Sequence, residues 1–255
     1  MLELDKSYIS DCLFEDNTTL FFTLTNEGYI DYTFNMIESL KRFNIDKKLF
    51  IFCLDESSNN ILRLKGYKTF LINTNLSAFT AFNEKGYDKI CYIKFLTIYK
   101  IIELGYNAFY TDGDIFFNKN PFEYILKLKN IDGDIWIQND SLTDNDYSNV
   151  CAGFMYVRSN DITKKYFECE SAESIKKYNE TGLKPPYDQA YFNKHIKSYL
   201  NLHMFPLSEF PNGRYFYKFS EKIQDTIVMV HFNWIIGHEK KKRMQKYNMW
   251  LESKQ

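Results

Sequence analysis

The sequence predicts an α/β protein in which helices flank a mixed, mostly parallel central sheet. Its apolar runs are continuous, as at 20–24 and 49–54, which is typical of strands covered on both faces. Segments with apolar residues at helical spacing alternate with these runs. The composition is average, with 45% hydrophobic and 25% charged residues, and this excludes a disordered, collagen-like or coiled-coil chain.

Strands are expected where a short run of apolar residues lies between polar segments. The first run ends at the polar segment 25–28 and the second at Asp55, as buried strands that lead into loops do. The third run is the weakest, and the last leads directly to His231. In chain order the runs are Leu20–Leu24, Leu49–Leu54, Tyr67–Ile72, Asn107–Thr111, Asp134–Gln138, Gly153–Val157 and Ile227–Val230.

Helices are expected where apolar residues recur every three or four positions, or where a capping residue starts a segment. Asp31 is placed to cap the first helix, in which apolar residues between 34 and 40 share one face. The strongest pattern lies at Ile93–Leu104, and Gly105 follows it as a stop. Further helices are expected at Pro121–Leu128, Thr163–Tyr178 and Asp188–Lys197.

The chain is expected to form a single domain over residues 1–255, because no internal repeat, low-complexity stretch or Gly/Ser linker divides it. The only candidate seam is the polar segment Asn139–Asn149. Ligands of such α/β proteins bind beyond the carboxyl ends of the strands. Polar residues at those ends are therefore the first candidates for a functional site.

Charge and cysteine content narrow the class of protein. Lys and Arg number 32 against 33 Asp and Glu, so the chain lacks the basic excess expected of a nucleic-acid-binding protein. The sequence shows neither a secretory signal nor an apolar segment of the ~20 residues that span a membrane. The five cysteines are scattered, which argues against a disulfide framework or a structural zinc site. A cytoplasmic protein is expected.

Two carboxylates, Asp112 and Asp114, follow the predicted strand 107–111. Like charges this close repel unless a cation or a hydrogen-bond network compensates. Hard oxygen ligands favour Mg²⁺ or Mn²⁺, which commonly bridge to phosphate oxygens. The competing interpretation is a tight turn, since Asp-Gly is a favoured turn dipeptide. The same tripeptide at Asp132–Asp134 precedes a strand instead of following one, and there the turn is the preferred interpretation.

His231 follows the last predicted strand, in the same position as the aspartate pair follows its own strand. A single histidine at a strand end is often only a hydrogen-bonded structural residue. Added to two carboxylates, however, an imidazole would shift the preferred cation from Mg²⁺ towards Mn²⁺. Lys240 and Lys241 could neutralise a phosphate, whereas Lys242 and Arg243 fit a solvated helix face better.

Four motifs in this order resemble those of the nucleotide-diphospho-sugar transferases, a family of GT-A-fold glycosyltransferases distantly similar to the glycogenin-like enzymes. The motifs are Tyr110–Phe117 followed by Pro121, Cys151–Arg158, Tyr187–Phe192, and His231–Asn233 followed by Gly237. The resemblance covers about Phe21 to Met249. It implies a Rossmann-like GT-A fold and a metal-dependent, retaining transfer of a sugar from a UDP-sugar to a hydroxyl of a glycan or protein-linked acceptor.

The resemblance also implies roles for individual residues. Asp112 and Asp114 match the family's Asp-x-Asp, which holds Mn²⁺, or alternatively Mg²⁺, against the donor diphosphate, and His231 matches the third metal ligand. Asp188 and Gln189 match an Asp-Gln pair that lines the sugar near the reacting carbon, and are the expected catalytic residues. The remaining donor-binding positions are Thr23, Thr25 and Asn26 for the uridine, Lys94 before the Asp-x-Asp, Asp112 and Gly113 within it, Gly153, and Gly237 and Lys240 over the diphosphate.

Residues of about 20–138 are thus expected to bind the donor, and those of about 150–250 to complete the metal and acceptor sites. Relatives often have Asn where this chain has Cys151. Many eukaryotic members carry a membrane anchor and stem, which this sequence lacks, so a bacterial, viral or otherwise cytosolic setting is expected.

Other functions stay open. One alternative is a non-catalytic module that binds a nucleotide sugar or glycan, and another is a metal-dependent phosphohydrolase that uses the aspartate pair. A sugar-nucleotide pyrophosphorylase fits less well, since no Gly-rich phosphate loop follows the first strand. The donor could carry galactose, glucose, xylose or N-acetylglucosamine.

The acceptor site is expected in loops at about 140–147 and 205–217. Tyr215 and Tyr217 lie there, and with Trp234 they could stack on a sugar or pack within the fold. Packing is the preferred interpretation.

Overall fold

The structure is a computed structural model that describes residues 3–72, 74, 76–78, 86–168 and 188–251. A seven-stranded sheet forms its centre, in the order β3-β2-β1-β4-β7-β6-β8. Every neighbouring pair is parallel except the two made by β7, so the predicted mixed, mostly parallel sheet is confirmed. The strands are β1 (Thr19–Thr25), β2 (Phe50–Cys53), β3 (Thr69–Leu71), β4 (Asn107–Thr111), β6 (Ile135–Asn139), β7 (Val150–Val157) and β8 (Leu202–Phe205).

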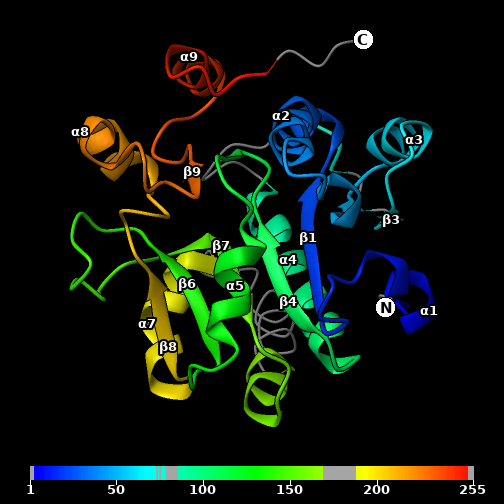
Figure 1. The fold of residues 1–255 in the computed structure, drawn as a ribbon. Coiled ribbons are helices and arrows are strands. Elements are labelled where there is room, and N and C mark those ends of the chain that lie inside the picture. Colours follow the sequence, from blue (N-terminus) through cyan, green and yellow to red (C-terminus); the bar gives the residue numbers. More distant parts are fainter. Residues whose placement is uncertain (1–2, 73, 75, 79–85, 169–187, 252–255) are drawn as a thin grey trace.

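Helices cover both faces of this sheet (Figure 1). One face packs against α4 and α7, and the opposite face against α2, α3 and α5. Successive residues of a strand point to opposite faces, so Phe21 and Phe22 enter different cores. This is why the strands are continuously apolar. The helices are α1 (Lys6–Ile9), α2 (Ile30–Lys41), α3 (Glu56–Leu64), α4 (Tyr87–Glu103), α5 (Phe122–Leu128), α7 (Asp188–Tyr199), α8 (Gly213–Ile223) and α9 (His238–Lys246).

A separate antiparallel ribbon pairs β5 (Ile115–Phe117) with β9 (Met229–His231). The last predicted strand, Ile227–Val230, therefore lies partly outside β9, and β9 does not join the central sheet. The chain leaves that sheet after β4, and the edge of the short β5 pairs with β9 when the chain returns. His231 is the final residue of β9 and stands opposite Ile115. A small core of residues from the ribbon, α2, α8 and α9 fixes this arrangement.

Several predicted helices need correction. Asp31 does not cap α2, because a short 3₁₀ turn, Glu27–Tyr29, precedes the helix and places Asp31 in its first turn. Helix α3 was not predicted, although the Asp55 carboxylate caps it by accepting from the Ser58 amide at 2.8 Å. The helix predicted at Thr163–Tyr178 is observed over 161–168, and its remainder lies outside the described residues.

The region predicted as an acceptor loop, 205–217, begins at the end of β8 and finishes inside α8, neither of which was predicted. Asn212 starts α8, because its side-chain oxygen accepts from the amide of Tyr215 at 2.9 Å. Among the described residues, no helix combines the length and apolar character needed to cross a membrane.

Candidate active site

A cavity of about 430 Å³ opens beyond the carboxyl ends of β1 and β4. Residues from β1, α4, β4, β7, α7 and the segment 231–240 line it, so it draws on both halves of the chain. Ten of the residues predicted for the site are among its lining residues. They are Thr25, Asn26, Lys94, Asp112, Gly113, Asp114, Gly153, Gln189, His231 and Lys240.

Three predicted residues stand apart from this set. Thr23 is fully buried in β1, and Gly237 starts α9 with a φ of +59°; neither is among the described residues that line the cavity. Asp188 is the first residue of α7, directly before Gln189, and its side chain lies outside the described part of the structure.

The predicted metal ligands Asp112, Asp114 and His231 come together at the base of the cavity. The Nε2 atom of His231 lies 3.3 Å from Oδ1 of Asp114 and 3.8 Å from Oδ2 of Asp112. Each residue offers a ligand atom, and these atoms all lie within 4.8 Å of one another. Asp114 and His231 are buried and Asp112 is partly exposed, so the group opens towards the cavity. Two carboxylates and one imidazole in this arrangement suit a divalent cation.

Gly153 allows these side chains to approach. The amide of Asp112 donates to the Gly153 carbonyl at 2.7 Å, which holds the start of the Asp-x-Asp against β7. A Cβ at position 153 would collide with the His231 ring and lie 2.6 Å from Oδ2 of Asp112. A side chain larger than hydrogen would therefore displace two of the three candidate ligands.

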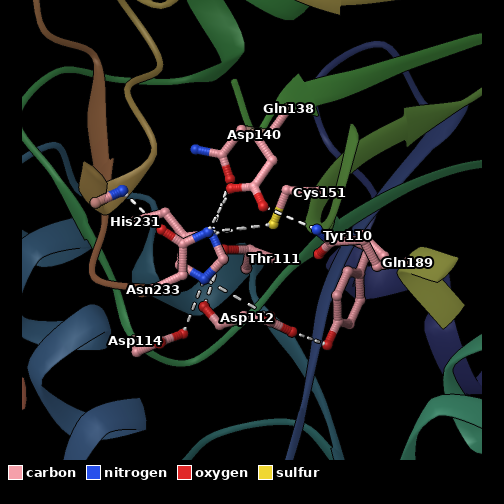
Figure 2. Close-up of polar contacts among 12 residues, drawn as sticks. Tyr110, Thr111, Asp112, Asp114, Gln138, Asp140, Cys151, Gln189, His231 and Asn233 are labelled. Carbon is pink, nitrogen blue, oxygen red and sulfur yellow. Dashed lines mark hydrogen bonds and ion pairs between the residues drawn. The ribbon is translucent and has the colours of Figure 1, made fainter. Parts of the chain in front are cut away.

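The other ring nitrogen of His231 faces away from the carboxylates (Figure 2). Its Nδ1 lies 2.7 Å from Oε1 of Gln138 and 3.6 Å from Sγ of Cys151. The Gln138 amide is itself oriented, because its Nε2 donates to the carbonyl of Phe210 at 3.2 Å. Oε1 must then accept the proton of Nδ1, so Nε2 is the nitrogen that faces the ligand position.

Burial and neighbouring charges shift the pKa values of the candidate metal ligands and of Cys151. Burial alone would lower the pKa of His231, but the charge and hydrogen bond of the Asp114 carboxylate outweigh it and raise the pKa well above its ordinary value. Burial would likewise raise the pKa of Asp114, but Lys240 and His231 outweigh it and hold the pKa below the usual range. Burial raises the pKa of the Cys151 thiol, which therefore stays protonated at neutral pH.

Lys94 supplies a buried positive charge on one side of the site. Its Nζ lies 3.5 Å from Oδ1 of Asp112 and donates to the carbonyl of Ala152 at 3.2 Å. The same ammonium lies 4.8 Å from the ring centre of Tyr110, whose hydroxyl donates to Oδ1 of Asp112. Asp112 is thereby held in one orientation from β4, β7 and α4.

Lys240 supplies a second buried positive charge from α9. Its Nζ donates to Oδ2 of Asp114 and, at 3.0 Å, to the hydroxyl of Tyr29. Lys241 differs, since it is exposed and its Nζ lies 4.5 Å from the ring centre of Trp250, outside the cavity lining. Of this basic pair, only Lys240 is placed to meet a phosphate bound in the cavity.

Asp140 is a buried cavity residue that the sequence did not single out as a site residue. Its Oδ1 accepts from Nδ2 of Asn233 and Nε1 of Trp234, both at 2.9 Å, and its Oδ2 accepts from Nε2 of Gln189 at 2.8 Å. The carboxylate thus ties α7 to the segment after β9. Asp140 follows β6 as Asp112 follows β4, and this was the available signal, but the residue was placed only in a polar seam and in an expected acceptor loop.

The nucleotide-diphospho-sugar transferase family matches residues 44–245. A UDP-galactose:fucoside alpha-3-galactosyltransferase of Dictyostelium discoideum is 26% identical over 89% of this chain and 42% of its own length. A UDP-D-xylose:L-fucose alpha-1,3-D-xylosyltransferase 3 of Arabidopsis thaliana is 30% identical over 59% of this chain and 44% of its own length. The chain therefore spans less than half the length of these curated relatives.

Solved structures agree on the fold. A glycosyltransferase involved in the glycosylation of the major capsid of PBCV-1 superposes with a TM-score of 0.53 at 11% identity, over 89% of this chain and 99% of that chain. The apo form of the glycosyltransferase GlyE of Streptococcus pneumoniae TIGR4 gives 0.53 at 13% identity, over 93% and 66%. Both expectations about fold and family are confirmed: the chain has the GT-A fold and belongs to the nucleotide-diphospho-sugar transferase family.

Proposed function

We propose that this protein transfers a sugar from a UDP-sugar to a hydroxyl of a glycan or protein-linked acceptor, in a reaction that depends on Mn²⁺ or Mg²⁺. The carrying observation is that Asp112, Asp114 and His231 converge in a cavity beside the buried ammonium of Lys240. The printed names of the relatives support UDP-galactose or UDP-xylose as the donor, and a fucose-containing acceptor.

The chain acts as one catalytic domain in this proposal, with the donor held mainly by residues 20–138. Thr25 ends β1 and Asn26 follows it, and we assign both to the uridine. The Asn26 amide also donates to the carbonyls of Leu76 and Ala78, at 2.8 and 2.9 Å, and so shapes the wall beside this loop. Residues 150–250 add His231, Lys240 and the acceptor side.

Catalysis then consists mainly of stabilising the departing UDP. A divalent cation held by Asp112, Asp114 and His231 would neutralise charge that develops on the diphosphate. Lys240 donates to the same leaving group, and its burial makes this positive charge effective because little water screens it. The preorganised charge favours the transition state over the bound substrate.

The transfer retains the configuration of the sugar in this proposal. The bond from C1 of the sugar to the UDP oxygen breaks, and the acceptor oxygen forms a new bond to C1 on the same face. The acceptor's proton passes to the leaving phosphate oxygen, so no strong protein base is required. We assign Asp188 and Gln189 to the stabilisation of the oxocarbenium-like sugar, and Asp140 positions the Gln189 amide through the 2.8 Å hydrogen bond.

The test is UDP release from UDP-galactose, UDP-xylose, UDP-glucose and UDP-N-acetylglucosamine, with Mn²⁺ or with a chelator. We expect release from one donor that rises with an acceptor glycoside and falls by about 100-fold or more without metal. A rate of UDP release that is the same with and without an acceptor glycoside would indicate a phosphohydrolase. Tight UDP binding without release would indicate a binding module, and absence of both would overturn the proposal. An inverted product would contradict retention alone.

Gln138→Leu is expected to weaken Mn²⁺ binding by about 10- to 100-fold, since the change removes the acceptor that orients His231. The measurement is titration calorimetry of Mn²⁺ in the presence of UDP, with the melting temperature recorded for each variant. Gln138→Glu is the matched control, because its carboxylate still accepts from Nδ1. Equal Mn²⁺ affinity in wild type and a folded Gln138→Leu variant would show that the amide does not orient the ring.

A further inference from the structure

Trp234 has a backbone conformation that is rare for a bulky residue. Its φ is +64°, in the left-handed region, where side chains with a Cβ are strained. The other non-glycine residues with positive φ in the described part of the chain are asparagines, which tolerate this region. Such strain persists where the surroundings hold a residue in place for a function.

The strain does not serve to bury the indole, because Trp234 is 53% exposed. Its ring is nevertheless anchored: Nε1 donates to the buried carboxylate of Asp140 at 2.9 Å. The same carboxylate accepts from Gln189, so the position of the indole is tied to a residue expected beside the donor sugar. An exposed aromatic ring is thus held at a set place relative to the site of reaction.

Trp234 also lines two spaces. It lines the candidate active-site cavity, and it lines a second, shallower hollow of about 480 Å³. The hollow is further lined by Leu142, Arg214, Tyr217 and Lys218. A ligand in the hollow would therefore lie next to the indole, directly beside the cavity that holds the candidate metal ligands.

The hollow has the chemistry of a saccharide site. The indole offers an apolar face with one polar edge, and this edge is already bonded to Asp140. Arg214 and Lys218 are exposed and offer several N–H donors, with the Arg214 guanidinium 5.4 Å from the ring centre of Trp234. The described lining residues of the hollow include no carboxylate. Its polar groups therefore suit a ligand rich in oxygen acceptors.

We propose that this hollow is the acceptor site, in which a pyranose ring of the acceptor glycan packs against Trp234 while Arg214 and Lys218 donate to its oxygens. The inference rests on the proposed function, since it gives the transferred sugar a recipient at the edge of the donor cavity. It also favours sugar stacking by Trp234, the alternative that the sequence left open, over the preferred interpretation of packing.

The direct test is saturation-transfer NMR of methyl α-L-fucopyranoside and the methyl pyranosides of galactose, glucose and xylose, with the full chain in UDP and Mg²⁺. We expect transfer to the ring protons of at least one glycoside, strong with wild type and lost with Trp234→Ala. Trp234→Phe should recover most of the signal, because it keeps an aromatic face. Tyr199→Ala removes an aromatic residue that is 64% exposed elsewhere, and is the matched control.

A second readout is the acceptor KM in the transfer assay. Loss of one aromatic contact, about 1.4 kcal/mol, corresponds to an increase in KM of about tenfold for Trp234→Ala. Equal NMR signals in wild type and Trp234→Ala, or no signal from any glycoside, would overturn the acceptor site. A wild-type chain that fails to bind UDP would instead overturn the proposed function, while the glycoside spectra would still report on the hollow.

Discussion

Asp114→Asn is expected to lower the rate of sugar transfer by a factor on the order of 10²–10³ or more. The carboxylate is 3% exposed and lies against Nε2 of His231 and the ammonium of Lys240. The neutral amide would leave the Lys240 ammonium next to a divalent cation that has one carboxylate fewer to bind it. The measurement is the rate of UDP release at saturating donor, together with the Mn²⁺ affinity by calorimetry.

Asp132→Asn is the matched control for this experiment. It lies in the second Asp-Gly-Asp tripeptide of the chain, at an exposed position outside the cavity lining. There its carboxylate accepts from the Asn201 amide at 3.1 Å. We expect a rate within about twofold of wild type, as for a surface substitution. An Asp114→Asn variant that folds and also keeps a wild-type rate would remove the Asp-x-Asp from the mechanism.

Phe154→Ala is expected to lower the free energy of unfolding by about 3–5 kcal/mol. Phe154 is fully buried, and its ring centre lies 5.2 Å from those of Phe109 and Phe205 and 5.6 Å from that of Phe210. Truncation would open a cavity where β4, β7, β8 and the chain before α8 meet. Urea unfolding at equilibrium, followed by fluorescence and circular dichroism, measures the loss.

Two comparisons make this value interpretable. Phe154→Leu should cost about 1 kcal/mol, because leucine fills much of the space. Tyr199→Ala should change stability by at most about 0.5 kcal/mol, because its side chain is 64% exposed. A loss below that of Phe154→Leu would mean that the neighbouring rings collapse and fill the cavity.

The continuous apolar strands were predictable because covering both faces of a sheet leaves no room for polar alternation. β8 was not predicted because it is an edge strand in which only Phe205 is buried, so it lacks a continuous apolar run. Helix α8 was not predicted, because its aromatic residues are as typical of a sugar-binding loop as of a helix. Its residues Phe216 and Ile223 are buried because they pack in a core shared with β9, and this contact is visible only in the folded chain.

The candidate metal ligands were predictable because Asp112 and Asp114 follow an apolar strand and His231 ends another, although His231 reaches the site on the β5–β9 ribbon outside the central sheet. Gln138 and Asp140 end or follow strand β6 too, yet their partners His231 and Asn233 lie 93 residues further along the chain. No local pattern records such a contact. The geometry of Trp234 was equally inaccessible, because a strained φ arises from the hydrogen bonds of the folded state.

The β5–β9 ribbon has a consequence for the order of assembly. Its three residue pairs close a loop that contains β6, β7, α7 and β8, so conformational entropy opposes its formation until those elements are in place. The ribbon should form last during folding and open first in local unfolding. His231 arrives with it, and Lys240 follows shortly after. Under the proposed function, a donor would therefore bind only the fully assembled chain, and its binding would stabilise that state.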